Sequence, residues 1–222
     1  MNATPDTRRD LLASRYRLVS QLADDLAHEI KNPLHAMVIN LEVLRRRLTA
    51  GDPDIALERA AVIDQEIQRT HQLVDLLLKL LRPERSRDQH AHSLAGALDE
   101  VLPLLRLQAK LALVPLETED LDIDAPITVA APDLKFALLA LAMPMIDVLK
   151  AAQGRGGDPT PLRLSVAHET AVRIRLHAAA EALPDTQARR VARRFLEAGG
   201  GRVETRRAQS SMYIVLPRVT GA

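Results

Sequence analysis

The chain has 222 residues, 47% of them hydrophobic and 27% charged, a balance typical of a globular protein that can bury a core. Thirty Lys and Arg against 29 Asp and Glu leave a formal net charge of +1, which gives no basis for binding nucleic acid or an anionic membrane. The absence of cysteine excludes disulfides, thiolate catalysis and zinc-thiolate sites, and fits a reducing compartment.

No segment of the sequence is typical of a membrane protein or a secreted one. The longest apolar run, residues 136–148, is too short to span a bilayer and contains Pro144 and Asp147. The N-terminal residues MNATPDTRRDLL lack the apolar core of a signal peptide. We therefore expect a cytoplasmic protein with neither a membrane nor nucleic acid as its partner.

The first third of the chain shows two helical patterns. From about residue 6 to residue 48, apolar residues recur at spacings of three and four, which predicts one long helix. The sequence TAGDPD at residues 49–54 supplies the Gly and Pro of a tight turn. A second stripe then keeps a strict heptad at Ala60, Ile63, Ile67, Thr70, Val74, Leu77 and Leu81. Together these patterns predict an antiparallel helical hairpin.

A lone hairpin cannot bury these apolar stripes on all the sides that they present. Pairing with a second copy would complete a four-helix bundle, and a strict heptad suits the seam of such a bundle. We therefore expect a homodimer. The alternative is that the stripes pack on the rest of the same chain.

The pattern changes after a polar connector at residues 82–92, so we expect two domains, residues 1–84 and 93–222. Helices are predicted at residues 94–107, 133–152 and 185–198. Strands are predicted at residues 111–116, 127–129, 162–169, 171–177, 202–207 and 211–216. Two of the strands alternate around Glu169 and Thr170, as in a hairpin. This order predicts an α+β sandwich with helices on one face of a mixed sheet.

Residues 28–34 of the first predicted helix have the sequence HEIKNPL and contain the candidate catalytic residues. His28 lies two residues from both Leu26 and Ile30, roughly 200° around the helix from either, so its imidazole should be exposed. An exposed neutral imidazole is a competent nucleophile toward a phosphoryl donor, and Glu29 beside it can hold or accept the ring proton. Pro33 removes the amide that would bond the Glu29 carbonyl, which should bend the helix.

The HEIKNPL string, on the first of two heptad helices and before an α+β domain, resembles the phosphoacceptor box of two-component histidine kinases. The resemblance covers residues 15–217 and implies a dimerising hairpin followed by a degenerate Bergerat-type α/β sandwich. It makes His28 the phosphoacceptor, with Lys31 and Pro33 in supporting roles. It also makes Glu29 and Asn32 the acidic-x-x-Asn pattern that such kinases use to dephosphorylate a response regulator, with Asn32 positioning a water. Receiver domains would dock along residues 34–45 and the neighbouring helix.

The nucleotide-binding residues that the resemblance leads one to expect are missing from this sequence. Where active kinases carry asparagines that coordinate magnesium and phosphate, this chain has Ala140 and Pro144, which offer no oxygen ligand. The Asp-x-Gly-x-Gly turn that reads adenine is replaced by HAAAEALPD at residues 177–185, and the lid over the triphosphate is missing. Residues 199–201, three glycines, resemble a helix C-cap. We expect no cofactor and no ATP-dependent autophosphorylation.

The remaining histidines and the arginine runs need no special function. His35, His71, His90 and His92 match no ligand spacing, so we expect no metal site. The arginines at residues 45–47 and 189–194 are typical of solvated helix faces.

Four functions remain open. The chain is expected to be a histidine phosphotransfer protein, a stand-alone relay that moves phosphoryl groups between His28 and receiver-domain aspartates and that takes them from an upstream hybrid kinase. Alternatively it is a phosphatase of response regulators acting through Glu29 and Asn32, or a pseudokinase adaptor that binds a receiver or a kinase without chemistry. A fourth alternative is that the degenerate domain binds another ligand in a small apolar cavity lined by Ala140, Met143, Pro144 and residues 178–180.

Overall fold

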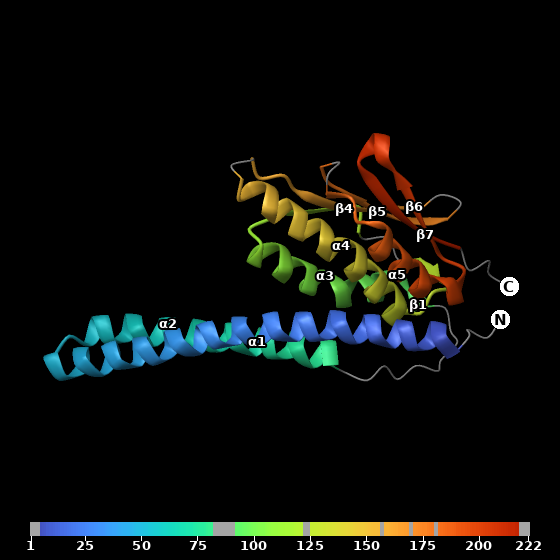
Figure 1. The fold of residues 1–222 in the computed structure, drawn as a ribbon. Coiled ribbons are helices and arrows are strands. Elements are labelled where there is room, and N and C mark those ends of the chain that lie inside the picture. The colour runs from blue at the N-terminus through green and yellow to red at the C-terminus, as the bar shows by residue number, and fades with distance from the viewer. Residues whose placement is uncertain are drawn as a thin grey trace. The chain divides into compact units, whose positions relative to one another are not determined.

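The computed structural model describes residues 5–81, 92–121, 125–155, 158–168, 171–179 and 182–217 (Figure 1). The chain forms two compact units, residues 19–83 and residues 1–18 together with 84–222. The first helix contributes to both units, because its N-terminal turns belong to the second. Within the part of the chain that is described, no helix combines the length and apolar character needed to cross a bilayer.

Two long helices, α1 (Pro5–Ala50) and α2 (Pro53–Leu81), confirm the predicted pair. The connection is shorter than the expected turn at residues 49–54, because the helices extend into both of its ends. Gly51 has a φ of +78°, which glycine adopts without a side-chain clash. The amide of Asp52 donates to the carbonyl of Arg47 at 3.0 Å, so the last turn of α1 is satisfied before α2 begins.

The remaining elements form the α+β unit. Its helices are α3 (Leu94–Leu111), α4 (Ala131–Gln153) and α5 (Thr186–Leu196). Its strands are β1 (His92–Ser93), β2 (Leu116–Glu119), β3 (Pro126–Ile127), β4 (Leu162–His168), β5 (Val172–His177), β6 (Arg202–Arg206) and β7 (Ser211–Leu216). The three predicted helices and four of the six predicted strands are confirmed to within a few residues. The hairpin residues Glu169 and Thr170 lie outside the described residues.

Two predicted strands need correction. The strand expected at residues 111–116 is wrong, because α3 continues to Leu111 and β2 begins only at Leu116. The apolar run before Pro115 has no alternation, so its sequence does not separate helix from strand. Leu113, with a φ of +59°, ends the helix, and sheet pairing starts after the proline. The strand expected at residues 127–129 is the shorter β3, which pairs with β1.

The main sheet has the strand order β2-β4-β5-β7-β6, in which β2 and β4 are parallel and the other neighbours antiparallel. Along β5, buried and half-buried residues alternate, as expected when one face of a sheet packs on a core. Figure 1 shows the helices α3, α4 and α5 on one face of this sheet. The expected fold, a helical hairpin followed by an α+β sandwich, is therefore correct.

The helix α4 packs between α3 and α5, which explains why most of its side chains are buried. Phe136 of α4 stacks on Phe195 of α5 with ring centroids 5.6 Å apart. The predicted glycines follow α5, since a 3₁₀ turn, Glu197–Gly199, continues from the helix and Gly200 caps that turn with a φ of +71°. Gly199 lies against the backbone of Val129, where no side chain would fit.

Candidate functional site

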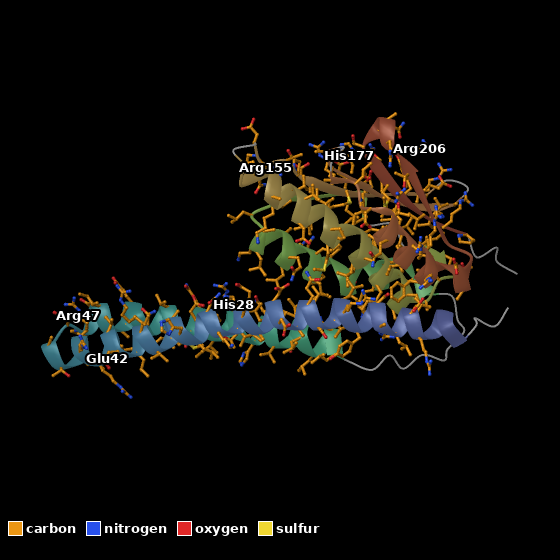
Figure 2. The ribbon with its side chains drawn as sticks, in the orientation of Figure 1. His28, Glu42, Arg47, Arg155, His177 and Arg206 are labelled. Carbon is orange, nitrogen blue, oxygen red and sulfur yellow. The ribbon has the colours of Figure 1, made fainter. Side chains whose placement is uncertain are left out.

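His28 lies near the middle of α1 and its side chain is exposed, so the exposure predicted from its helical position is confirmed. Two residues earlier, Leu26 is fully buried, which shows how sharply the environment changes around the helix. Figure 2 shows His28 on the helical hairpin with its side chain drawn. An exposed imidazole is accessible to a protein as large as another domain.

The next residue, Glu29, is 8% exposed and does not share the environment of His28. Its Oε1 accepts a hydrogen bond of 3.0 Å from Nδ2 of Asn32. Residues three apart lie on the same face of a helix, so this contact follows from the spacing of the acid and the amide. The structure therefore brings Glu29 and Asn32 together as a pair, with Asn32 at the exposed end.

Arg69 of α2 completes the group, and sequence reasoning missed it. Its Nη2 lies 3.1 Å from Oε2 of Glu29, and its Nη1 lies 3.9 Å from Glu66. A carboxylate removed from water requires a charged partner, and a guanidinium supplies one with directed donors. Both oxygens of Glu29 are thus engaged, and neither contact is with His28. A role for Glu29 in moving the ring proton stays a prediction.

The two supporting residues differ in their surroundings. Lys31 is exposed, whereas Pro33 is buried inside α1. The helix runs without interruption through Pro33, although proline has no amide to donate to the carbonyl of Glu29. The bend expected at this point stays a prediction.

The other histidines do not gather around His28. His35 and His71 are exposed on α1 and α2, while His90 and the side chain of His92 lie outside the described residues. In the described ranges, no three side chains of the His, Asp or Glu type are close enough together to hold a metal ion.

Of the residues that the family resemblance aligns with nucleotide-binding positions in α4, Ala140 is buried and Pro144 is half-buried. Ala140 and Met143 are each 5% exposed and Ala178 is 3% exposed, whereas Ala180 lies outside the described residues. The connection from β5 to α5 is short, because β5 ends at His177 and α5 starts at Thr186.

Two pockets of about 580 Å³ and 340 Å³ open near the start of α5. Most of their lining is polar or charged and comes from α1, α5, β6 and the residues next to α5 and β6. Neither Ala140 nor Pro144 is part of it. The small apolar cavity expected from the sequence is neither of these pockets.

Comparisons with known proteins agree with the hairpin. Residues 18–86 match the family described as His Kinase A (phospho-acceptor) domain. The signal transduction histidine-protein kinase AtoS of Escherichia coli (strain K12) is 29% identical over 157 residues, which are 70% of this chain and 25% of that kinase. Sporulation kinase D of Bacillus subtilis (strain 168) is 28% identical over 107 residues, 48% of this chain and 20% of that kinase. The chain therefore spans a quarter or less of the length of these curated relatives.

Among solved structures, the histidine kinase AdeS of Acinetobacter baumannii is similar with a TM-score of 0.42 and 13% identity, covering 87% of this chain and 98% of that one. The matched residues 18–86 contain His28, the pair Glu29 and Asn32, and Arg69. The exposed histidine and its neighbours thus lie in a hairpin that matches the phospho-acceptor domain of histidine kinases, and the chain is similar to histidine kinases of two-component signalling.

Proposed function

We propose that this protein is a histidine phosphotransfer protein, which exchanges phosphoryl groups between His28 and receiver-domain aspartates without using ATP. The observation that carries the proposal is the exposure of His28 in a hairpin matched by the phospho-acceptor family. A nucleophile that must reach the aspartate of another protein has to be exposed on the surface of its own helix pair, as His28 is.

The reaction needs no co-reactant beyond the two proteins. An unprotonated ring nitrogen of His28 attacks the phosphorus of the aspartyl phosphate, forming a P–N bond. The acyl P–O bond breaks and the aspartate leaves as a carboxylate with the bonding electrons. The reverse reaction passes the group to a second aspartate. Catalysis is then mainly a matter of positioning, which the rigid α1 helix supplies.

The composition of the α+β unit supports transfer without ATP. Its central helix α4 presents Ala140 and Pro144 where the family resemblance expects metal-binding amides, and neither side chain can ligate a hard cation. The direct step from β5 to α5 leaves little chain for a loop over a triphosphate. We therefore expect no heat of binding when Mg²⁺-ATP is titrated into the protein, and a saturable signal would contradict this part of the proposal.

We further propose that residues 1–84 form the dimerising phosphoacceptor domain and residues 93–222 the degenerate domain. The heptad on α2 supports a homodimer, because Ile67, Val74 and Leu81 are 36%, 36% and 52% exposed in the single chain. Apolar residues that repeat every three and four positions and remain exposed are suited to a helix-helix seam. Receiver domains would dock on the side of α1 that bears Leu34, Val38 and Leu41, all exposed.

A phosphatase is the second candidate, and the contact between Glu29 and Asn32 favours it. One amide hydrogen of Asn32 is held by Glu29, while the side chain remains exposed at its other end. An amide held in this way can orient a water for attack on an aspartyl phosphate. The P–O bond to the water then forms, the acyl P–O bond breaks, and inorganic phosphate and the free carboxylate are released. His28 need not be phosphorylated in this reaction.

The test is transfer of radiolabelled phosphate from phosphorylated receiver domains of the same cell to the purified protein. Three proteins are compared, the wild type, His28→Ala and His35→Ala. His35 is a matched control, because it is exposed on the same helix about two turns further along. We expect acid-labile label on the wild type and on His35→Ala, and none on His28→Ala.

Release of free phosphate with no label on the wild type would favour the phosphatase, provided that Asn32→Ala abolishes the release. No change in any labelled receiver would contradict both activities and would favour the adaptor function. An adaptor would still bind the receivers, and both His28→Ala and Asn32→Ala would leave that binding unchanged.

A further inference from the structure

The face of the main sheet that the helices do not cover carries an ordered array of cationic side chains. On β5, Val172, Ile174 and Leu176 are buried, so Arg173, Arg175 and His177 point to the opposite face. Figure 2 shows His177 and Arg206 on the side of the sheet away from α3 and α4. The pairing of the strands places this open face in register across β4, β5, β7 and β6.

Three cross-strand rows make up what we call the arginine face. They are Ala167, Arg173, Val215 and Arg202; Ser165, Arg175, Tyr213 and Glu204; and Arg163, His177, Ser211 and Arg206. Neighbours within a row lie about 5 Å apart, and rows are separated by about 7 Å along the strands. Five side chains of these rows are arginines, and none is a lysine.

Only part of this positive charge is neutralised by the protein itself. Arg163 is paired with Glu117, and Arg202 with Glu204 at 2.7 Å. For Arg173, Arg175 and Arg206, no carboxylate of a described residue lies within ion-pair distance. The Arg202 hydrogen bond lowers the pKa of the Glu204 carboxyl, and the charges of Arg202, Arg173 and Arg206 lower it further. The guanidiniums of Arg202, Arg173 and Arg206 thus all act on the carboxylate of Glu204.

Tyr213 stands at the centre of the arginine face and holds two of these arginines. The guanidinium carbon of Arg206 lies 5.3 Å from the centre of its ring, and that of Arg175 lies 6.0 Å away. Arg175 also donates to the Ser211 hydroxyl at 3.0 Å, and Ser211 is fully buried. Side chains that are already ordered lose less entropy when a partner binds, so these contacts prepare the face for association.

We propose that the arginine face is a docking surface for an acidic protein partner, whose carboxylates pair with Arg173, Arg175 and Arg206. Charge complementarity supports this occupant, since these three guanidiniums, two of them held by Tyr213, have no carboxylate partner among the described residues and can offer bidentate donors to one. Arg and Tyr are also the residues that dominate the centres of protein interfaces. Glu117, Glu119 and Glu204 share the face and interrupt its positive charge. Such a surface suits a protein that places a few carboxylates opposite the three arginines better than it suits the continuous charge of a phosphate backbone.

The experiment measures fluorescence anisotropy of a labelled glutamate peptide of about 20 residues at low salt, where screening is weak. The test variant is Arg173→Glu with Arg206→Glu, and Arg206→Gln is a milder single change at an exposed site. The matched control is Arg106→Glu with Lys110→Glu, which makes the same change in net charge on exposed positions of α3. A single-stranded oligothymidylate of similar charge serves as the competing class of ligand.

We expect the wild type and the α3 control to bind the peptide alike, and the double variant of the arginine face to bind it about tenfold more weakly or worse. Arg206→Gln should give a smaller loss, with an unchanged melting temperature. The proposal would be overturned if the control and the test variant lost affinity for the peptide equally. It would also be overturned if the wild type did not bind the peptide. Tighter binding of the oligothymidylate through the same arginines would also overturn it, in favour of a nucleic acid.

Discussion

Arg69 of α2 reaches across the helical hairpin to Glu29 of α1, with Nη2 and Oε2 3.1 Å apart. The other oxygen of Glu29 accepts the amide of Asn32 at 3.0 Å, so one carboxylate links an arginine on α2 to an asparagine beside His28. This arrangement makes Glu29 a fixed point between the two helices. The position of Asn32 therefore depends on a residue that is 37 places beyond it in the chain.

The first prediction is that Arg69→Ala reduces hydrolysis of receiver phosphate more than it reduces transfer to His28. Without Arg69, Glu29 is buried with an unneutralised charge and no longer fixes the Asn32 amide. Because Arg69 is 42% exposed at its side chain, we expect the hairpin to lose only about 1–2 kcal/mol of stability. Urea unfolding and the rates of phosphate release and transfer measure the two effects.

The control for this prediction is the double variant Arg69→Ala with Glu29→Gln. Removing the charge of Glu29 removes the need for a cation, so the double variant should regain part of the lost stability while hydrolysis stays low. A double variant as unstable as Arg69→Ala alone would show that Arg69 acts through some contact other than Glu29.

The second prediction concerns the close approach of Gly199 to Thr128 and Val129, the two residues that follow β3. A Cβ at Gly199 would lie 2.5 Å from Cα of Val129 and 2.8 Å from the carbonyl oxygen of Thr128, both of which are backbone atoms. We expect Gly199→Ala to destabilise the α+β unit by about 3 kcal/mol, the upper end of the usual cost of overpacking. Thermal unfolding followed by circular dichroism measures the change.

Gly96→Ala is the matched control for that substitution. Nothing lies within 4 Å of the added Cβ at this position in the first turn of α3. Alanine favours helix and restricts the unfolded chain, so Gly96→Ala should raise stability by about 0.5–1 kcal/mol. If both substitutions were harmless, the contact between Gly199 and Val129 would not be tight in solution.

The sequence could predict the parts of the site that depend on one helix. The exposure of His28 follows from its angle to Leu26, and the contact of Glu29 with Asn32 follows from their spacing. Arg69 could not be found in this way, because its partner lies on another helix. Counting from the turn gives a clue, since Glu29 lies 22 residues before Gly51 and Arg69 lies 18 after it. This offset is about one helical turn, within the reach of an arginine side chain.

The elements of the fold were predictable where their periodicity was unambiguous. The alternating strands β4 and β5 and the long helices have patterns of one period only. The apolar run at residues 111–114 shows neither the helical nor the strand period. The α3 helix extends into it, because the amides of Ala112 and Leu113 donate to carbonyls of the last turn of α3. The register that gathers the arginine face could not be predicted, because it depends on which strands become neighbours.

The third prediction tests the dimer through the heptad of α2. Ile67→Glu with Val74→Glu places two charges on the exposed stripe, and burying either against a second helix would cost too much for a bundle to form. We expect the wild type to sediment as a dimer and this variant as a monomer. Leu57→Glu, on the same helix but outside the heptad and 69% exposed, should remain a dimer. A monomeric wild type would contradict the bundle.

The fourth prediction is a pH dependence set by Glu204 on the arginine face. Arg202 donates to its carboxylate at 2.7 Å and lowers the pKa of Glu204 in the folded protein. A carboxyl whose folded pKa is depressed adds stability above its unfolded pKa, near pH 4, and this contribution disappears as the pH falls through the lower folded value. Glu204→Gln should therefore cost about 0.5 kcal/mol at pH 7, a small amount because the pair is largely exposed. At about pH 2 the variant and the wild type should unfold at the same urea concentration, since both then carry a neutral side chain. A difference that persists unchanged into acid would show that the side chain stabilises β6 by packing, independently of its charge.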